Sequence, residues 1–144
     1  MNDQARHLAV LRIGAESWNR HRAATMPEWI PFTGILLAGG NLAGFDLRWV
    51  QFYHSDLSSV RFHRANLNET YFWHCRLAGA EFEDITDASL AFSWCDLHGT
   101  IFRKCFGIVL CEPDCEVRGI THEEDCLEWF HTEPPTEDEE GGAK

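Results

Sequence analysis

The chain has 144 residues, of which 23 are Asp or Glu and 12 are Lys or Arg, so its net charge is −11. No basic patch suits direct nucleic-acid binding, and no stretch approaches the roughly 20 apolar residues of a membrane span. The N-terminus also lacks a basic region followed by an apolar secretory segment. We therefore expect a cytoplasmic protein that binds neither nucleic acid nor membrane, with its six cysteines as reduced thiols.

Residues 1–29 are predicted to form an N-terminal helix and a connecting segment that together cap the domain. A helix over Asp3 to Ala24 places four apolar residues on one side: Leu8, Leu11, Ala15 and Trp18. Pro27 and Pro31 then lead the chain out of this helix. A cap of this kind is needed wherever a stack of coils leaves its end open.

Residues 30–104 carry a hydrophobic residue at every fifth position. The series is Phe32, Leu37, Leu42, Leu47, Phe52, Leu57, Phe62, Leu67, Phe72, Leu77, Phe82, Asp87, Phe92, Leu97 and Phe102. A period of five matches neither the 3.6 of a helix nor the 2 of a strand. The chain must therefore turn through about a quarter circle every five residues, with these side chains inside.

The repeated blocks, such as Ser55–Ser59, Ala65–Glu69 and Cys95–Gly99, resemble the pentapeptide-repeat family. Its consensus is a small residue, Asp or Asn, Leu or Phe, and two polar residues. The resemblance implies an all-β solenoid: a right-handed, four-sided β-helix with twenty residues per coil, here about 3.75 coils. It also implies a mostly non-enzymatic protein without fixing one activity.

Residues twenty apart are expected to stack in columns. One column holds Phe32, Phe52, Phe72 and Phe92; the next holds Leu37, Leu57, Leu77 and Leu97; the third holds Leu42, Phe62, Phe82 and Phe102. A second inward row contains Val50, Val60, Ala65, Cys75, Ala80, Ile85, Leu90 and Cys95. Asp87 departs from the repeat in the fourth column, and we interpret it as a junction with the C-terminal cap.

The wall backed by Phe52, Phe72 and Phe92 is predicted to present a cluster of aromatic side chains. Its outward residues include Gln51, Tyr53, His54, Tyr71, Trp73, His74 and Trp94. Such clusters are enriched at protein interfaces, so we predict a surface that binds another protein or a second copy of the chain. The alternative is that the N-terminal helix or the C-terminal cap covers this wall.

The wall backed by Phe62, Phe82 and Phe102 is predicted to be a solvated face. Opposite charges alternate between its coils: Arg61 over Glu81, His63 beside Glu83 and Arg103, and Arg64 beside Asp84 and Lys104. Stacked pairs of this kind stabilise weakly and favour one register.

Residues 105–132 are predicted to form a C-terminal cap, and 133–144 an acidic disordered tail. Phe106 to Leu110 suit a last strand, and Thr121 to Glu124 suit a capping box that opens a short helix through Phe130. Four residues of the cap are potential zinc ligands: Cys111, Cys115, His122 and Cys126. Ordinary thiols in a small cap are the simpler interpretation.

The favoured function is a non-enzymatic platform for protein–protein interaction that needs no cofactor. One alternative is a DNA mimic that binds or protects DNA gyrase, which requires a regular negative surface. The repeat segment carries 8 acidic and 6 basic residues, and its coils span only about 18 Å. The other alternative is a zinc-stabilised regulatory module.

Overall fold

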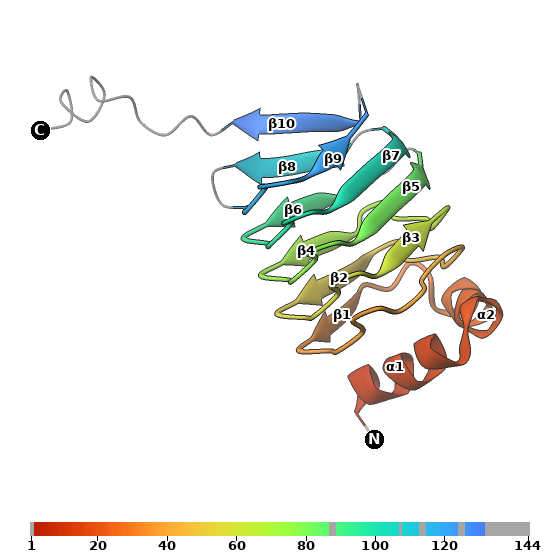
Figure 1. Ribbon diagram of the computed structural model, residues 1–144. Helices are drawn as coiled ribbons and strands as arrows, with labels where there is room; N and C mark the ends of the chain where they lie inside the picture. The colour runs from red at the N-terminus through yellow and green to blue at the C-terminus, as the bar shows by residue number, and fades with distance from the viewer. Residues whose placement is uncertain (1, 87–88, 107, 113–114, 124–125, 132–144) are drawn as a thin grey trace, which may run out of the picture.

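The computed structural model is a coil of parallel β-strands with two helices at its N-terminal end (Figure 1). It describes residues 2–86, 89–106, 108–112, 115–123 and 126–131. Asp87 and Gly107, the positions where the fourth column departs from Leu or Phe, lie outside the described residues, as does the predicted tail at 133–144.

Two helices replace the single helix that was predicted over residues 3–24. Helix α1 spans Asp3–Ile13 and helix α2 spans Ala15–Thr25, and Gly14 separates them with a φ of 143°. Residues with a side chain rarely adopt this backbone angle, so the break falls at the glycine. The Asn2 side chain caps α1 by accepting a hydrogen bond from the backbone N–H of Ala5.

The strands form two parallel sheets on different sides of the coil. The first sheet has the order β1 (Ile30–Thr33), β2 (Val50–Tyr53), β4 (Tyr71–Trp73), β6 (Ala91–Ser93), β8 (Ile108–Glu112) and β10 (Leu127–His131). The second has the order β3 (Arg61–His63), β5 (Glu81–Ile85), β7 (Ile101–Cys105) and β9 (Thr121–His122). Isolated parallel bridges such as Asp56 to Arg76 and Asp46 to Asn66 stack the two remaining sides. The predicted four-sided β-helix is therefore confirmed.

The phenylalanine columns fill the interior as predicted. Phe52, Phe72 and Phe92 are fully buried and stack with ring centroids 5.2 and 5.0 Å apart. Phe62 and Phe82 stack at 4.7 Å in the column on the opposite wall. The two columns touch across the interior, because the ring of Phe72 lies edge-on to those of Phe62 and Phe82. Offset and edge-to-face arrangements of this kind are favourable for aromatic rings.

Leu57, Leu77 and Leu97 are also fully buried, whereas Leu37 in the first coil is only partly buried. No preceding coil lies beneath Leu37, so its side chain borders a groove instead of a packed interior.

The second inward row ties each coil to the one before it by side-chain hydrogen bonds. The hydroxyl groups of Thr70 and Thr100 donate to the carbonyl oxygens of Leu47 and Leu77, at 2.7 and 2.8 Å. The thiol of Cys75 donates to the carbonyl oxygen of Phe52 in the same way, at 3.2 Å. Polar atoms are thereby tolerated in a dry interior, because each donor has an acceptor in the neighbouring coil.

Trp18 and Arg22 of α2 close the N-terminal end of the coil. Both side chains are fully buried, and the indole of Trp18 lies 6.1 Å from the ring of Phe32, at the bottom of the phenylalanine column. The indole N–H donates to the carbonyl oxygen of Asp46 at 2.7 Å, and an Nη2 hydrogen of Arg22 to that of Arg48 at 2.6 Å. These contacts satisfy polar groups at the open end of the coil, as the predicted cap requires.

The helix predicted between Thr121 and Phe130 is wrong, because this segment adds strands to the coil. Strand β9 pairs with β7, and β10 pairs with β8. A helix of ten residues has little stability of its own, whereas a new strand satisfies the exposed backbone edge of the preceding coil. The register also shifts here, since Phe92 pairs with Leu110 and not with Glu112, which lies twenty residues on.

Candidate protein-binding face

The predicted surface residues meet on the first sheet, on the strands β2, β4 and β6. We call this surface the aromatic wall and define it by Gln51, Tyr53, His54, Tyr71, Trp73, His74 and Trp94. Parallel pairing in register, with Tyr53 opposite Trp73, aligns outward side chains on neighbouring coils. The ring of Tyr53 lies edge-on to those of Trp73 and Tyr71, at 5.9 and 6.5 Å.

Three exposed rings form a ladder along one edge of the aromatic wall. His54 and His74 stack at 5.0 Å with 7° between their planes, and His74 and Trp94 at 5.8 Å with 11°. Trp94 is 54% exposed. Trp73 packs edge-on against both histidines, which holds the ladder against the sheet. The rings are thus ordered by one another before any partner binds.

The backbone of this ladder is in a conformation that favours glycine. The φ angles of His54, His74 and Trp94 are 49°, 53° and 56°, and the equivalent residue of the first coil is Gly34. A side chain in this region costs roughly 1–2 kcal/mol per residue relative to a right-handed backbone. The wall backed by Phe62, Phe82 and Phe102, called the charged wall below, has the same positive φ angles at Arg64, Asp84 and Lys104. The angle is therefore a property of the corner of the coil and does not depend on a ring at that position.

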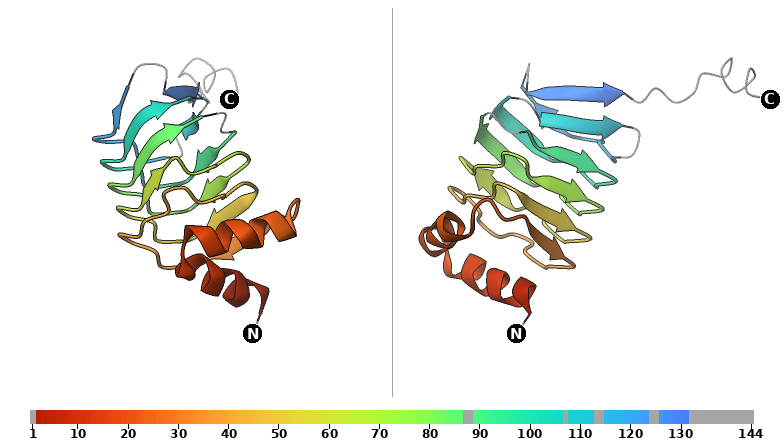
Figure 2. Two further views of the ribbon diagram at one scale, coloured as in Figure 1. Left: turned by 90° about the vertical axis from the view of Figure 1, so that its right-hand side faces the viewer. Right: turned by 180° about the vertical axis from the view of Figure 1, so that it is seen from behind.

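The N-terminal helices do not cover the aromatic wall. They lie together beyond the first coil, next to β1 (Figure 2). Helix α1 is joined to the coil by Gln4, whose side chain exchanges two hydrogen bonds with the backbone of Thr33. Strands β8 and β10 extend the same sheet instead of folding over it. In the part of the chain that the structure describes, the wall is therefore open.

The opposite sheet carries the alternating charges that were predicted. Glu81 forms an ion pair with Arg61 at 3.1 Å and lies 4.0 Å from Arg103, and Arg64 lies 3.7 Å from Asp84. His63 lies 3.6 Å from both Glu81 and Glu83. These side chains face solvent, so each pair contributes little stability, and this sheet remains a solvated face.

The structure separates the cysteines that were considered as zinc ligands. Cys115 continues the column of Cys75 and Cys95 and donates to the carbonyl oxygen of Phe92, whereas Cys126 lies beside Cys105 in another column. His122 is exposed, and the side chain of Cys111 lies outside the described part. Within the described residues, no three His, Cys, Asp or Glu side chains converge as a metal site would require. Burial, together with the neighbouring thiol of Cys126, raises the pKa of Cys105 to about 12 even though hydrogen bonds to the backbone of Ile85 and Arg103 act in the opposite direction, as expected for an inert thiol.

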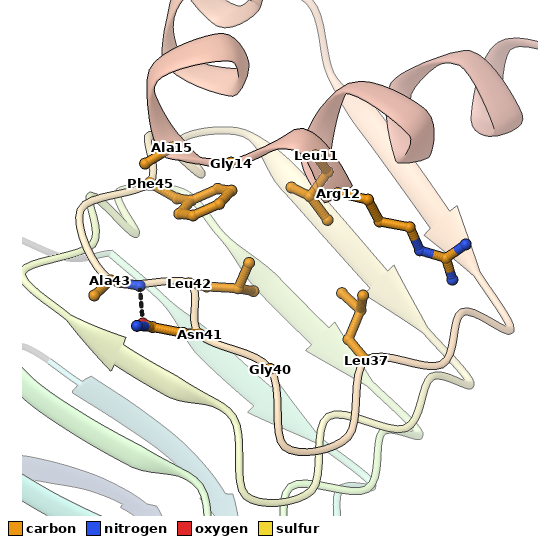
Figure 3. Close-up of a pocket in the computed structure, with 10 residues that line it drawn as sticks. All are labelled: Leu11, Arg12, Gly14, Ala15, Leu37, Gly40, Asn41, Leu42, Ala43 and Phe45. Atoms are coloured by element: carbon orange, nitrogen blue, oxygen red, sulfur yellow. Dashed lines mark hydrogen bonds between the residues drawn. The ribbon is translucent and has the colours of Figure 1, made fainter.

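A groove of about 410 Å³ lies where the two helices meet the first coil (Figure 3). Leu11 projects into it from α1, and Leu37, Leu42 and Phe45 face Leu11 from the coil. Its walls are mostly apolar, and the polar side chains among them, Arg12 and Asn41, form no acid–base pair or nucleophile suited to catalysis. None of the described helices is long and apolar enough to cross a membrane.

Sequence reasoning missed two features of the N-terminal cap. One is the burial of Arg22, which was not expected because charged side chains are rarely fully buried. The other is a hydrogen bond between His7 and His21, which lie on different helices. No local pattern reveals either feature, because both depend on how the two helices meet.

The fold defines the chain as a four-sided parallel β-solenoid with ring-bearing side chains on one wall. The family model described as pentapeptide repeats matches residues 32–68, with 8 copies of the repeat. Over these residues the chain carries the pentapeptide repeats that the family model describes.

No curated protein matches the chain. Two solved structures with a similar course of the chain are full-length QnrB1, a plasmid-mediated fluoroquinolone resistance protein, and Rfr23 from the cyanobacterium Cyanothece 51142. QnrB1 is 13% identical with a TM-score of 0.48, covering 69% of this chain and 81% of its own. Rfr23 is 14% identical with a TM-score of 0.32, covering 81% of this chain and 100% of its own. Likeness at this level carries no argument about function.

Proposed function

We propose that this protein is a non-enzymatic module for protein–protein interaction and that the aromatic wall is its contact surface. The observation that carries the proposal is the ladder of His54, His74 and Trp94, whose rings are exposed and already ordered. Ordered aromatic side chains lose little entropy on binding and bury a large area, which is why they dominate binding energy at interfaces.

The charge distribution supports the same surface. No outward residue of β2, β4 or β6 and none of the ladder is Asp, Glu, Lys or Arg, although the chain has a net charge of −11. Interface centres are depleted in charged residues, because burying a charge requires its desolvation. The sheet on the other side, with Arg61, Glu81 and Arg103, has the composition of a surface that stays in water.

A pair of double variants tests the proposal without disturbing the fold. His74→Gly with Trp94→Gly removes two rings from the ladder, and glycine suits the backbone at both positions. The matched control is Arg64→Gly with Lys104→Gly, at the equivalent corner of the charged wall.

Each immobilised full-length variant is compared with the wild type for proteins captured from cell extract and for self-association by sedimentation velocity. We expect the ladder variant to lose at least about tenfold in affinity for a captured partner or a second copy, a loss that equals about 1.4 kcal/mol. The control variant should retain the affinity of the wild type. Equal binding by the wild type and the ladder variant contradicts the proposal.

DNA mimicry is the alternative class of function, and the described surface does not favour it. Arg61, Glu81 and Arg103 alternate in sign along the coil axis, whereas a mimic needs charges of one sign at regular spacing. A supercoiling assay with purified DNA gyrase separates the two functions. Inhibition or drug protection that survives in the ladder variant supports mimicry and contradicts the aromatic wall as the working surface.

A further inference from the structure

The two N-terminal helices are joined by a hydrogen bond between histidine rings. Nδ1 of His7 in α1 lies 2.7 Å from Nε2 of His21 in α2, and the ring centroids are 5.0 Å apart. Both side chains are half-buried, and the ring of His21 also packs against that of Trp18, with the centroids 5.6 Å apart. The bond therefore links α1 to the side of α2 that closes the coil.

The two helices are attached to the coil to very different degrees. Helix α2 is fixed by the buried Trp18 and Arg22, and its Asn19 also bonds the backbone of Gly44 and Asp46. Leu11 is the one described residue of α1 that is buried, and Gln4 supplies the hydrogen bonds of α1 to the coil. Leu8 and Val10 of α1 also pack, partly buried, against the core, so the histidine pair is one of a small set of contacts that hold α1 in place.

The protonation states of the two rings decide whether this hydrogen bond can exist. A 2.7 Å contact between two ring nitrogens needs one N–H and one lone pair. The first additional proton binds the outer nitrogen of the donor ring and leaves the bond intact. The second proton can bind only the lone pair that accepts the bond, so the doubly protonated pair has no bond and carries two positive charges in contact.

We infer that His7 and His21 form an acid-sensitive latch that releases α1 from α2 and from the coil. The latch holds while at most one of the two rings is protonated and opens when both are. Release of α1 removes Leu11 from the groove in Figure 3 and exposes the apolar side chains of Leu42 and Phe45 at the end of the coil.

The surroundings set the direction of the pH dependence. Burial first, and then the charge of His21, lower the pKa of His7 below its ordinary value of 6.5, while Arg6 acts in the same direction and Glu28 and Asp3 oppose it. Because the folded protein disfavours the charged ring, the latch stabilises the cap above pH 6.5 and loses this contribution as the pH falls. Each unit by which folding lowers the pKa of a group corresponds to about a tenfold change in the equilibrium between the attached and released states of α1 once that group is protonated.

Hydrogen exchange with mass spectrometry tests the latch on the full chain. Amide protection in residues 3–13 is measured at about pH 7.5 and about pH 5 and corrected for the intrinsic exchange rate. We expect protection of α1 to fall by about tenfold at the lower pH, while that of the central strands β4 and β6 changes little.

The decisive variant is His21→Gln, whose side-chain amide donates from its nitrogen to the lone pair of neutral His7 and, after the amide turns over, accepts with its oxygen from protonated His7. It should keep α1 protected at both pH values. His7→Asn serves the same purpose if His21→Gln does not fold, and His98→Gln, at an exposed position in a distant coil, is the control that should behave as the wild type. Unchanged protection of α1 in the wild type, or an equal loss in His21→Gln, overturns the proposal.

Discussion

His54, His74 and Trp94 adopt left-handed backbone angles, although Gly34 occupies the equivalent position in the first coil. The local geometry alone favours glycine at all four positions. What opposes the backbone cost at the three others is ring stacking, which contributes about 0.5–1.5 kcal/mol for each aromatic pair. The two terms are similar in size, so these positions are energetically tolerant and their side chains are free to serve a surface role.

We therefore expect His74→Gly to change the free energy of unfolding by less than about 1 kcal/mol, because relief of the backbone angle offsets the lost stacking. His74→Ala loses the stacking and keeps the unfavourable angle, so it should be the less stable variant by about 1 kcal/mol. Urea unfolding of both variants measures the difference. If His74→Ala is the more stable of the two, the backbone angle assigned to this corner is wrong.

Helix α2 supplies the plug for the open end of the coil. Trp18 covers the ring of Phe32, at the N-terminal end of the phenylalanine column, and its indole N–H donates to the carbonyl oxygen of Asp46. Arg22 donates to the carbonyl oxygen of Arg48. Helix α1 contributes much less buried surface, since Leu11 is its one described residue that is fully enclosed. The stability of the cap accordingly lies in α2, and α1 is the part of the cap that is able to move.

Trp18→Ala should lower the free energy of unfolding by about 3–5 kcal/mol, because it leaves a cavity at the end of the core and an unpaired carbonyl group at Asp46. The matched control is Trp29→Ala, since Trp29 is 45% exposed and stacks on the ring of Trp49. That change should cost about 1 kcal/mol. Similar losses in the two variants contradict the role of Trp18 as the plug.

The described coils form a stack in which each strand pairs with strands of the adjacent coils. Phe72 occupies the centre of this stack, with Phe52 below it, Phe92 above it, and Phe62 and Phe82 against its edge. Solenoids of this kind are stabilised by interfaces between adjacent repeats. A defect in the middle coil therefore weakens both halves of the molecule.

Phe72→Ala is expected to lower the free energy of unfolding by about 3–5 kcal/mol. Phe106→Ala, at a ring that is 58% exposed, should change it by less than about 0.5 kcal/mol and serves as the control. Denaturant unfolding followed by tryptophan fluorescence and circular dichroism measures both. A loss below about 1 kcal/mol in Phe72→Ala contradicts the continuous core.

The sequence was a poor guide at the two ends of the coil. The pattern of residues 3–24 suits one helix, but Gly14 divides it, and the side chains of the resulting helices then decide how they pack. The pattern of Thr121 to Glu124 suits the start of a helix, but Thr121 and His122 pair with the exposed edge of β7 as a strand. In both places a local preference worth a few tenths of a kcal/mol yields to contacts that the local sequence does not contain.

The five-residue period by itself determined the coil, its four sides and the residues that share a wall, including Tyr53, Trp73 and His74. It could do so because each repeat uses the same short-range geometry, so one turn of the chain predicts the next. Only the tertiary structure decided that the aromatic wall stays uncovered by the helices, that Arg22 is buried and that His7 meets His21. These features arise where non-repeating segments meet the coil, and packing between distant segments has no periodic signature.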